Sequence, residues 1–542
     1  MRWRIWVLFI VLSISYSGLF LNVYNLQIRK GDYYLKKAGA QQRASGTLEA
    51  RRGNIYFTDK NNNLIPAALN KEYPMIYAVP KDIDDPETSA ISLSGIVNKT
   101  EKTLIEYFSK PNDSYELLVS KADSQQINQV EELDLRGIYI NTHLLRFYPF
   151  GNLASHLIGF VAPVDETLMG RYGVEFYLDD DLGGKSGRID GRETVKPEDG
   201  KEIVLTIDRN IQSRAEEILG ELIKKYKAEK GTVIVQEPKS GKILAMGNFP
   251  TFDPNNYSQF DISSFLNPAT QAVYEPGSVF KLITMAAGID SGKITPQTTY
   301  VDTGSVVLNG KTIKNWDLKA HGEQTMTGVI EQSLNTGAVF AQRQMGSDIF
   351  YNYLIKFGLN ELTGLSLPGE VRSNIRNLLN GRDIDFATAS FGQGVAVTPV
   401  AMISAISAIA NGGVLMKPLI LEREEPQVIR RVISPQVSEA ISKMMVSAVE
   451  KNYIAAIPNY SIAGKTGTAF VPDFKNGGYT DDVINTYIGF APAYDPKFII
   501  LVRLDRPYGG PLAGLTIVPT FKDMAQYMIN YYNIAPDRID IE

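Results

Sequence analysis

The 542-residue chain contains no cysteine and only three histidines, and this excludes several kinds of chemistry. Without cysteine there can be no disulfide, no thiolate nucleophile and no thiolate metal site. The three histidines (His143, His156 and His321) form no H-x-x-x-H pair. So few histidines give little support for a zinc hydrolase or a Ser-His-Asp hydrolase. We therefore expect acid–base chemistry to use lysine, serine, tyrosine or carboxylate groups.

The chain also has no excess of positive charge, since 55 Lys and Arg residues oppose 60 Asp and Glu residues and leave a net charge of −5. This balance gives no support for a nucleic-acid partner. The 45 glycines and 27 prolines form no repeat or low-complexity tract, so the composition is that of an ordinary globular protein. At about 150 residues per domain, the length corresponds to about three domains.

One long apolar run is present near the N-terminus, at residues 5–23. As a helix it spans roughly 28 Å, about the thickness of a bilayer core. We predict a transmembrane helix over residues 5–25, preceded by a four-residue tail. A cleavable signal peptide is the alternative; Ala38-Gly39-Ala40 has the small-residue pattern of a cleavage site, but it lies too far beyond the apolar run.

A change of pattern divides the rest of the chain. Residues 187–201, GRIDGRETVKPEDGK, are charged and punctuated by glycine and proline, which indicates a linker or domain edge. Strands at both ends of the following region, with mainly helical sequence between them, predict a self-contained α+β domain with one antiparallel sheet. The strand-like runs are residues 204–207, 232–236, 242–246, 461–470, 485–492 and 498–504.

Ser278 stands out as a candidate nucleophile because it follows Pro-Gly at the start of a helical apolar pattern. Lys281, three residues later, shares its helix face. A serine hydroxyl needs a base, and a buried lysine that has lost its proton can act as one. S-x-x-K alone is more often a capping serine and a surface lysine, but no other serine in this chain has a lysine at that spacing.

Two further motifs follow in order. Ser333-Leu334-Asn335 begins 55 residues after Ser278, and Lys465-Thr466-Gly467-Thr468 begins 187 residues after it. Neither is specific alone, since Lys185-Ser186-Gly187 and Lys239-Ser240-Gly241 also match K-[ST]-G. Those two precede Ser278 in turn-like contexts, whereas Lys465 lies in a strand-like run. The ordered triple is far more specific than its parts.

This triple resembles the S-x-x-K, S-x-N and K-T-G motifs of penicillin-binding proteins and serine β-lactamases. Over nearly the whole chain, further segments are similar to class B penicillin-binding proteins: Arg52-Gly53-x-Ile55, Arg146-x-Tyr148-Pro149-x-Gly151, Gly170-Arg171-x-Gly173-x-Glu175, Gln236–Met246, Phe252–Asn255, Phe391–Gly394, Val397–Pro399 and Ala410–Gly413. Asp59-Lys60-Asn61-Asn62 departs from the usual Asp-Arg-Asn-Gly, which concerns that local turn and not the active site.

The resemblance implies an α+β protein with a single N-terminal transmembrane helix, an elongated membrane-proximal domain of mixed structure and a transpeptidase domain. The transpeptidase domain is expected to be penicillin-binding/β-lactamase-like, with a five-stranded antiparallel sheet flanked by helices. The expected boundaries are 1–4 for a cytoplasmic tail, 5–25 for the transmembrane helix, 26–200 for the membrane-proximal pedestal (dimerisation-like) domain and 201–542 for the transpeptidase domain. Arg52, Arg171 and Glu175 match family positions that tie the pedestal together, so we expect them to be structural.

The resemblance also implies acyl transfer through a covalent acyl-enzyme. Ser278 is the expected nucleophile, attacking the carbonyl between the two terminal D-alanines of a peptidoglycan stem peptide, and Lys281 is the expected base. Ser333 is expected to relay a proton to the leaving amine, and Asn335 to hydrogen-bond Lys281 or the substrate backbone.

The third motif is expected to bind the substrate. Lys465 supplies positive potential near the terminal carboxylate, and the hydroxyls of Thr466 and Thr468, on either side of Gly467, bind that carboxylate. The backbone N–H groups of Ser278 and Thr468 form the expected oxyanion hole, worth about 3 kcal/mol per donor. The resemblance implies no metal and no cofactor.

Three alternatives remain at this point. A β-lactamase needs a deacylating base, commonly in E-x-x-L-N; Glu370–Asn374 is a near match, but its context resembles a class B segment and Ser373 replaces the leucine. A non-enzymatic β-lactam sensor usually adds several membrane helices and an H-E-x-x-H protease motif. A membrane-anchored D,D-carboxypeptidase shares the three motifs but typically lacks the long membrane-proximal module.

The resemblance also implies a set of partners. They are peptidoglycan stem peptides and β-lactams, a membrane-embedded glycan polymerase of the SEDS (shape, elongation, division and sporulation) family, and the cell membrane through one helix; nucleic acid is not among them. The catalytic domain is expected on the periplasmic or extracellular face of the cell membrane. The contexts Ile313–Asp317 and Tyr274–Ser278 are more similar to division-type than to elongation-type enzymes, which favours a role in cell division.

Overall fold

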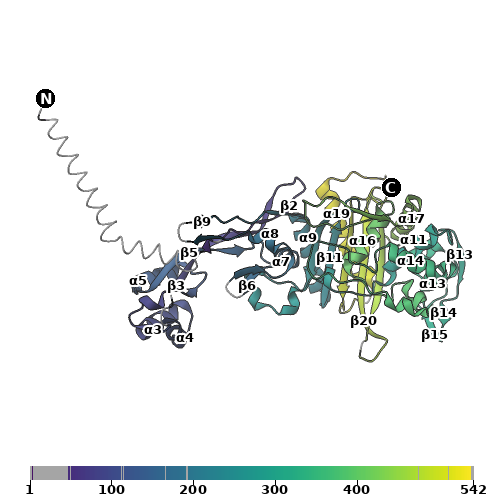
Figure 1. Ribbon diagram of the computed structural model, residues 1–542. Coiled ribbons are helices and arrows are strands. Elements are labelled where there is room, and N and C mark those ends of the chain that lie inside the picture. The colour runs from purple at the N-terminus through teal and green to yellow at the C-terminus, as the bar shows by residue number, and fades with distance from the viewer. Residues whose placement is uncertain are drawn as a thin grey trace. The chain divides into compact units, whose positions relative to one another are not determined.

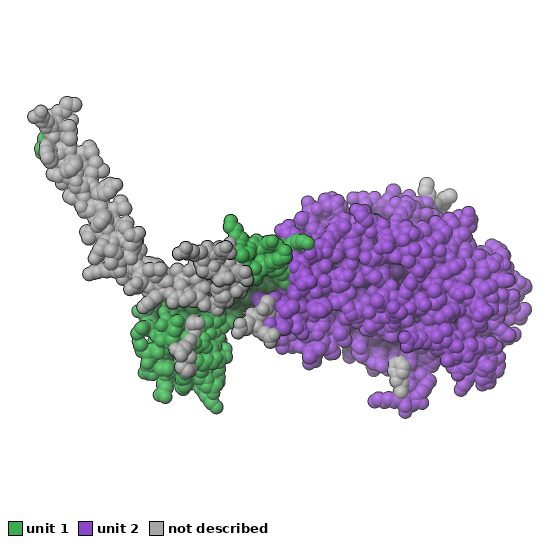
Figure 2. All heavy atoms as spheres, viewed as in Figure 1, with its two compact units in different colours: residues 1–52, 70–147, 183–201 green, residues 53–69, 148–182, 202–542 purple. Residues whose placement is uncertain are grey.

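The computed structural model describes residues 3, 47–48, 50–110, 113, 115–164, 167–190, 193–473, 475–510 and 512–538. The predicted membrane span at residues 5–25 lies outside these residues. Within the described part of the chain, no helix has the length and apolarity needed to cross a bilayer. The chain forms two compact units: unit 1 takes residues from 1–52, 70–147 and 183–201, and unit 2 takes 53–69, 148–182 and 202–542 (Figure 2).

Unit 1 is a small mixed unit with its own core. Two of its helices begin at aspartate caps: Asp85 accepts from the Thr88 N–H, and Asp123 forms a capping box with Gln126. The core of this unit includes Leu93 and Leu104, which are fully buried. Its elements are β1 (Thr47–Leu48), the later part of β3 (Ile65–Ala78), η2 (Pro80–Asp82), α3 (Pro86–Val97), α4 (Glu101–Phe108), β4 (Glu116–Val119), α5 (Ser124–Leu133), β5 (Ile138–Phe147), β8 (Gly187–Asp190) and β9 (Glu193–Val195). Strand β3 pairs with β4 and β5, and β8 lies between β1 and β9.

Unit 2 is built around a five-stranded sheet in the order β12-β11-β21-β20-β19, in which all neighbours are antiparallel (Figure 1). The strands are β11 (Lys230–Gln236), β12 (Ile243–Phe249), β19 (Ala463–Pro472), β20 (Tyr479–Ala491) and β21 (Phe498–Asp505). The expected α+β class with an antiparallel sheet is confirmed. Strand β19, which carries the third motif, is an edge strand.

Helices cover both faces of this sheet, so alternate residues of each strand enter different cores. Val233 and Val235 pack with α9 (Arg209–Tyr226) and α19 (Val518–Tyr532) on one face. Ile234 points to the other core, which includes α11 (Lys281–Asp290), α16 (Pro399–Ala410) and α17 (Pro435–Asn452). Burial on both faces explains why the central strand β21, FIILVRLD, is almost continuously apolar.

Smaller elements complete unit 2. Among them are two-stranded ribbons, which pair β6 with β7, β13 with β16, β14 with β15 and β17 with β18. The elements are β2 (Ile55–Thr58), α6 (Ser155–Ile158), β6 (Val161–Val164), β7 (Thr167–Gly170), α7 (Gly173–Tyr177), α8 (Asp179–Gly183), β10 (Ile203–Asp208), η3 (Pro254–Gln259), η4 (Ile262–Phe265), α10 (Pro268–Gln271), η5 (Gly277–Phe280), β13 (Thr299–Asp302), β14 (Ser305–Leu308), β15 (Lys311–Lys314), β16 (Gly322–Thr325), α12 (Met326–Gln332), α13 (Asn335–Met345), α14 (Ser347–Lys356), η6 (Arg376–Asn380), α15 (Asp383–Ala389), β17 (Val414–Met416), β18 (Val428–Arg431) and α18 (Ala513–Thr516).

The core of unit 2 includes residues from well before position 202. Strand β10 pairs in parallel with β2, and Phe57 and Leu157 are fully buried in the same cluster as Leu205. Unit 2 is therefore discontinuous in sequence, because β2 and the segment 148–182 complete its apolar core.

This arrangement predicts the stability of fragments. A fragment that begins at Glu202 leaves Leu205 and its neighbours without their partners, and each large apolar side chain so exposed costs roughly 1.5–3 kcal/mol. We expect it to unfold at least about 5 °C below a fragment that begins at Gly53, as measured by thermal denaturation followed by circular dichroism. Equal unfolding temperatures for the two fragments would contradict this account of the core.

Candidate active site

Ser278 lies in a tight turn that requires glycine beside it. It is the second residue of η5, a 3-10 turn that leads directly into α11. Gly277 has φ +60°, and a Cβ at this position would lie 2.8 Å from the carbonyl oxygen of Thr468. The Gly277 N–H donates to the carbonyl oxygen of Gly392 at 3.1 Å. The turn that carries Ser278 is thus held between strand β19 and the loop at Gly392.

The side chain of Lys281 is completely buried, with 0% of its surface exposed. Its Nζ lies 3.0 Å from Oγ of Ser278, one helical turn earlier. The same Nζ lies 2.6 Å from the carbonyl oxygen of Ser333 and 2.9 Å from Oδ1 of Asn335. These oxygens replace the water that burial removes, and they hold Nζ against the serine hydroxyl.

Ser333 joins the second motif to both lysines. It ends α12 in the left-handed conformation, with φ 59°, so that the chain turns directly into α13. Its Oγ lies 3.4 Å from Nζ of Lys281 and 3.0 Å from Nζ of Lys465. The Ser333 hydroxyl therefore lies between the two amines, at hydrogen-bond distance from Lys465 and slightly farther from Lys281.

The third motif lies on edge strand β19, beside the turn of Ser278. Lys465 Nζ donates to the Thr466 carbonyl oxygen at 3.0 Å and lies 3.4 Å from the Thr466 Oγ1. A Cβ at Gly467 would lie 2.6 Å from the carbonyl oxygen of Pro276, so glycine is required for this close approach. The Thr468 hydroxyl donates to Oδ1 of Asn485 at 3.2 Å. Hydrogen bonds thus join Ser278, Lys281, Ser333, Asn335 and Lys465, and Thr466, Gly467 and Thr468 border this cluster.

Burial gives the two lysines unequal basicity. It lowers the pKa of Lys281 well below its ordinary value, and the positive charge of Lys465 lowers it further. Burial also lowers the pKa of Lys465, to about 7. Because repulsion from a charged Lys465 favours the neutral form of Lys281, Lys281 loses its proton first. A neutral Lys281 beside a charged Lys465 is the state in which the serine has a base and the site keeps a cation.

Asn315, which follows strand β15, is a positioning residue that sequence reasoning missed. Its Oδ1 accepts from the backbone N–H groups of Asn335 at 3.0 Å and Thr336 at 3.3 Å. The N-cap residue of α13, Leu334, has no capping side chain, so Asn315 satisfies these N–H groups from another element. Asn335 Nδ2 donates to the carbonyl oxygen of Lys314 at 2.9 Å, which leaves Oδ1 facing Lys281.

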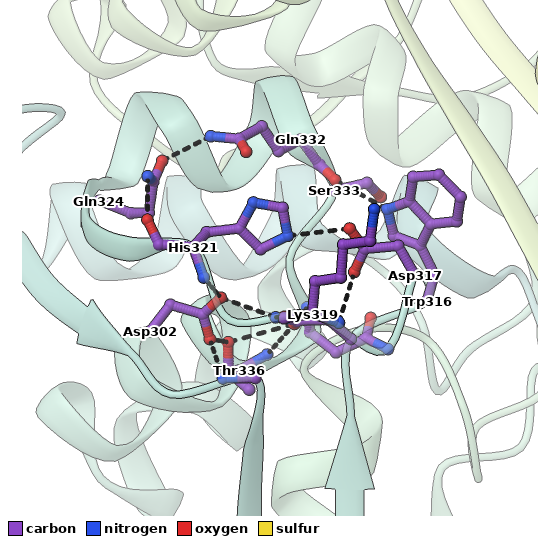
Figure 3. Close-up of polar contacts among 12 residues, drawn as sticks. Asp302, Trp316, Asp317, Lys319, His321, Gln324, Gln332, Ser333 and Thr336 are labelled. Atoms are coloured by element: carbon purple, nitrogen blue, oxygen red, sulfur yellow. Dashed lines mark hydrogen bonds and ion pairs between the residues drawn. The ribbon is translucent and has the colours of Figure 1, made fainter.

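A buried aspartate, Asp302, holds Asn315 in turn and also contacts Thr336 (Figure 3 labels Asp302 and Thr336). Asp302 accepts from Asn315 Nδ2 at 2.8 Å and from the Thr336 hydroxyl at 2.7 Å. On the outer side of this cluster, Trp316 is 59% exposed, and its indole N–H donates to the carbonyl oxygen of Gln332 at 3.0 Å (Figure 3). In the sequence, the segment 313–317 stood out by its family resemblance. Its contacts with residues 332–336 could not be predicted, because they form only when the chain folds.

Comparison with known proteins identifies the family. Residues 231–524 match the penicillin binding protein transpeptidase domain, and residues 47–207 match the penicillin-binding protein dimerisation domain. Stage V sporulation protein D of Bacillus subtilis is 31% identical over 528 residues, which cover 91% of this chain and 80% of that protein. The chain belongs to the class B penicillin-binding proteins.

Other relatives of this penicillin-binding protein agree with the assignment. Peptidoglycan D,D-transpeptidase FtsI of Escherichia coli is 27% identical, and the match covers 99% of this chain and 93% of that protein. The crystal structure of penicillin binding protein 3 from Mycobacterium tuberculosis, complexed with aztreonam, has a TM-score of 0.71 at 26% identity. That match covers 92% of this chain and 100% of the other.

Two other acidic residues of interest have structural roles in this penicillin-binding protein. Glu370, considered as a deacylating base, accepts from the N–H and hydroxyl of Thr363 at 2.7 and 2.6 Å and from the Gly364 N–H at 3.1 Å. Glu370 therefore stabilises the loop in which it lies. Glu175 is fully buried and accepts from the Tyr148 hydroxyl at 3.3 Å. Across the described ranges, no cluster of His, Asp or Glu side chains is arranged to hold a metal ion.

The two lysine pKa values predict a bell-shaped pH dependence for acylation by a penicillin, which carries a carboxylate. The rate rises as Lys281 loses its proton and falls as Lys465 loses its charge near pH 7. We expect Lys465→Arg to move the falling limb to higher pH, because arginine stays charged. The measurement is the second-order acylation constant between pH 5 and 9. A wild-type profile that stays flat above pH 7 would contradict this assignment.

Asn315→Ala is expected to slow acylation by a fluorescent penicillin at least about tenfold. The change leaves the N–H groups of Asn335 and Thr336 without their acceptor, at a cost of about 1–3 kcal/mol for each buried group, removes one of the donors to Asp302, and loosens Asn335 from Lys281. Lys314→Ala is the matched control, since only the backbone of Lys314 contacts Asn335. If Asn315→Ala and Lys314→Ala acylate at the same rate, Asn315 has no positioning role.

Proposed function

We propose that this protein is a serine-type peptidoglycan D,D-transpeptidase that acts on stem peptides ending in D-Ala-D-Ala and is acylated by β-lactams. The observation that carries the proposal is the 3.0 Å separation between Oγ of Ser278 and Nζ of the completely buried Lys281. A serine beside a lysine of lowered pKa is an activated nucleophile. The relatives named as peptidoglycan D,D-transpeptidases support the substrate class.

The acylation step follows from these contacts. Neutral Lys281 accepts the Ser278 proton as Oγ bonds to the carbonyl carbon of the penultimate D-alanine. The bond from that carbon to the terminal D-alanine nitrogen then breaks, and Lys281 returns the proton to the leaving amine through the Ser333 hydroxyl. Backbone N–H groups of Ser278 and Thr468 stabilise the oxyanion in the proposed mechanism.

The second half of the reaction transfers the acyl group. The amine of a neighbouring stem peptide attacks the Ser278 ester, loses its proton along the same path and leaves a new amide bond with the serine regenerated. Lys465 binds the terminal carboxylate by its charge during acylation, together with the hydroxyls of Thr466 and Thr468. The hydroxyls of Thr466 and Ser333 both lie within 3.4 Å of the Lys465 Nζ, which supports this grouping.

The alternatives use the same nucleophile but need other features. A β-lactamase requires a deacylating base, and the Glu370 carboxylate is occupied by Thr363 and Gly364. A D,D-carboxypeptidase transfers the acyl group to water; the match of residues 47–207 to the dimerisation domain favours the transpeptidase. The ratio of cross-linked to hydrolysed product distinguishes these two enzymes.

We also propose a cellular setting. The apolar run at 5–23 anchors the protein in the cell membrane, with the catalytic domain on the extracytoplasmic face. There it acts beside a membrane-embedded SEDS-family glycan polymerase. A role in division rather than elongation is supported by the contexts Ile313–Asp317 and Tyr274–Ser278.

The nucleophile is tested by intact mass after incubation with benzylpenicillin. We expect one adduct on the wild type, located on the peptide that contains Ser278, and none on Ser278→Ala. Ser240→Ala is the matched control, because Ser240 lies in a second K-S-G sequence that we assign to a turn. An adduct that persists on Ser278→Ala would rule out Ser278 as the acylated residue.

A further inference from the structure

A cavity of about 610 Å³ lies in unit 2 next to the catalytic cluster. Its walls come from Tyr274 and Glu275, from Asn374, Arg376 and Asn377, from residues 394–396, and from the sheet strands at residues 471–472, 484 and 505–506. None of the five hydrogen-bonded catalytic residues lines it. Its volume is that of a typical small-molecule site. The mechanism proposed above assigns it no role.

The cavity lies within reach of the acyl group on Ser278. Glu275 precedes Ser278 by three residues, and Val471 follows Thr468 by three residues along β19. Three residues of strand cover about 10 Å. The turn of Ser278 approaches β19 at Thr468, so Val471 in the cavity wall lies about 10 Å along the edge strand from this point of approach.

Most charged groups around the cavity neutralise one another. Arg506 pairs with Glu229, and Lys230 Nζ lies 3.7 Å from the same carboxylate. Asp505 accepts two hydrogen bonds from Arg503, at 2.7 and 2.6 Å. After these pairs are formed, two charged side chains in the lining have no partner of opposite charge among the described residues.

These two side chains are Glu275 and Arg376. Glu275 is 9% exposed, and its carboxylate accepts only from neutral donors, the Gly394 N–H at 3.0 Å and the Tyr479 hydroxyl at 3.0 Å. Burial without a cation raises the pKa of Glu275. Arg376 is exposed; its backbone N–H donates to Asn374, and its guanidinium makes no hydrogen bond or ion pair with any described residue.

The remaining lining is apolar and includes Val273, Val395, Val471 and Ile484. A matching ligand carries a short methylene chain, an ammonium group for Glu275 and a carboxylate for Arg376. A stem peptide presents such a group when its third residue is diaminopimelate, whose side chain ends in an amine and a carboxylate on one carbon. A lysine at this position presents the amine alone.

We propose that this cavity binds the side chain of the third residue of the donor stem peptide and selects a side chain that ends in both an amine and a carboxylate. This inference rests on the proposed transpeptidase function. The third residue is one extended residue, about 3.4 Å, from the one whose carbonyl reacts. Four carbon–carbon bonds of about 1.5 Å add about 5 Å in zigzag form, and the bond to the terminal amine or carboxylate adds about 1.5 Å, so the charged end of a fully extended side chain lies up to about 10 Å from the reacting carbonyl.

The test uses the full-length protein and three synthetic donor pentapeptides that differ only at position three: diaminopimelate, lysine or norleucine. The measurement is kcat/KM for release of terminal D-alanine, divided by the acylation rate with benzylpenicillin, which lacks this side chain. We expect wild type to prefer lysine over norleucine, and diaminopimelate over lysine, by about tenfold at each step.

Two variants separate the two contacts. Arg376→Gln should make the diaminopimelate and lysine donors equivalent, because only the carboxylate loses its partner. Glu275→Gln, which keeps a side chain able to accept from Gly394, should remove the preference of lysine over norleucine. Arg372→Gln is the matched control, since Arg372 is an exposed arginine of the same segment outside the cavity lining.

The outcomes distinguish the two levels of the argument. If wild type reacts with neither benzylpenicillin nor any donor, the proposed function fails. If it reacts with all three donors at the same rate, or if Arg376→Gln and Arg372→Gln keep the same preference for diaminopimelate, the cavity does not read the third residue. If Glu275→Gln slows acylation by benzylpenicillin, the proposal is decided by the preference for diaminopimelate over lysine in Arg376→Gln compared with Arg372→Gln.

Discussion

The burial of the Lys281 amine beside the Ser278 hydroxyl is the constraint on which the rest of this site depends. A lysine with 0% exposure is costly in its charged form, so the amine is held ready to accept a proton. The oxygen atoms of Ser278, Ser333 and Asn335 surround its nitrogen and replace the lost water. Two separate parts of the chain meet at this nitrogen, and Ser333 connects them to a third, Lys465 on β19.

The fold brings the three motifs together from three different elements. Ser278 lies in a 3-10 turn before α11, Ser333 lies between α12 and α13, and Lys465 lies on the edge strand β19. Glycines at 277 and 467 allow the turn and the strand to approach closely. Asn315 then replaces the missing cap of α13 from a neighbouring ribbon, so the direction of the Asn335 side chain depends on residues 20 positions away.

Paired and unpaired charges divide the surroundings of the nucleophile into two regions. On one side, Asp302 is saturated by neutral donors such as Asn315 and Thr336, which makes a rigid support. On the other side, Glu275 and Arg376 border a cavity without partners of opposite charge, which is the arrangement of a surface that receives a ligand. Because a buried charge requires compensation, the saturated carboxylate of Asp302 indicates a structural cluster, whereas the buried carboxylate of Glu275, which has no cation beside it among the described residues, indicates a candidate binding surface.

The sequence by itself determined the order and spacing of Ser278, Ser333 and Lys465, the alternation of strand and helical patterns, and the resemblance to class B penicillin-binding proteins. These are local signals, readable because apolar periodicity and short motifs involve neighbouring residues. Only the tertiary structure decided that β2 and residues 148–182 complete the core of unit 2, that Asn315 supports α13, and that Glu275 and Arg376 share a cavity. Each of these contacts is between residues that are distant along the chain. Which of them become buried or lack a partner depends on tertiary packing, which local sequence patterns do not predict.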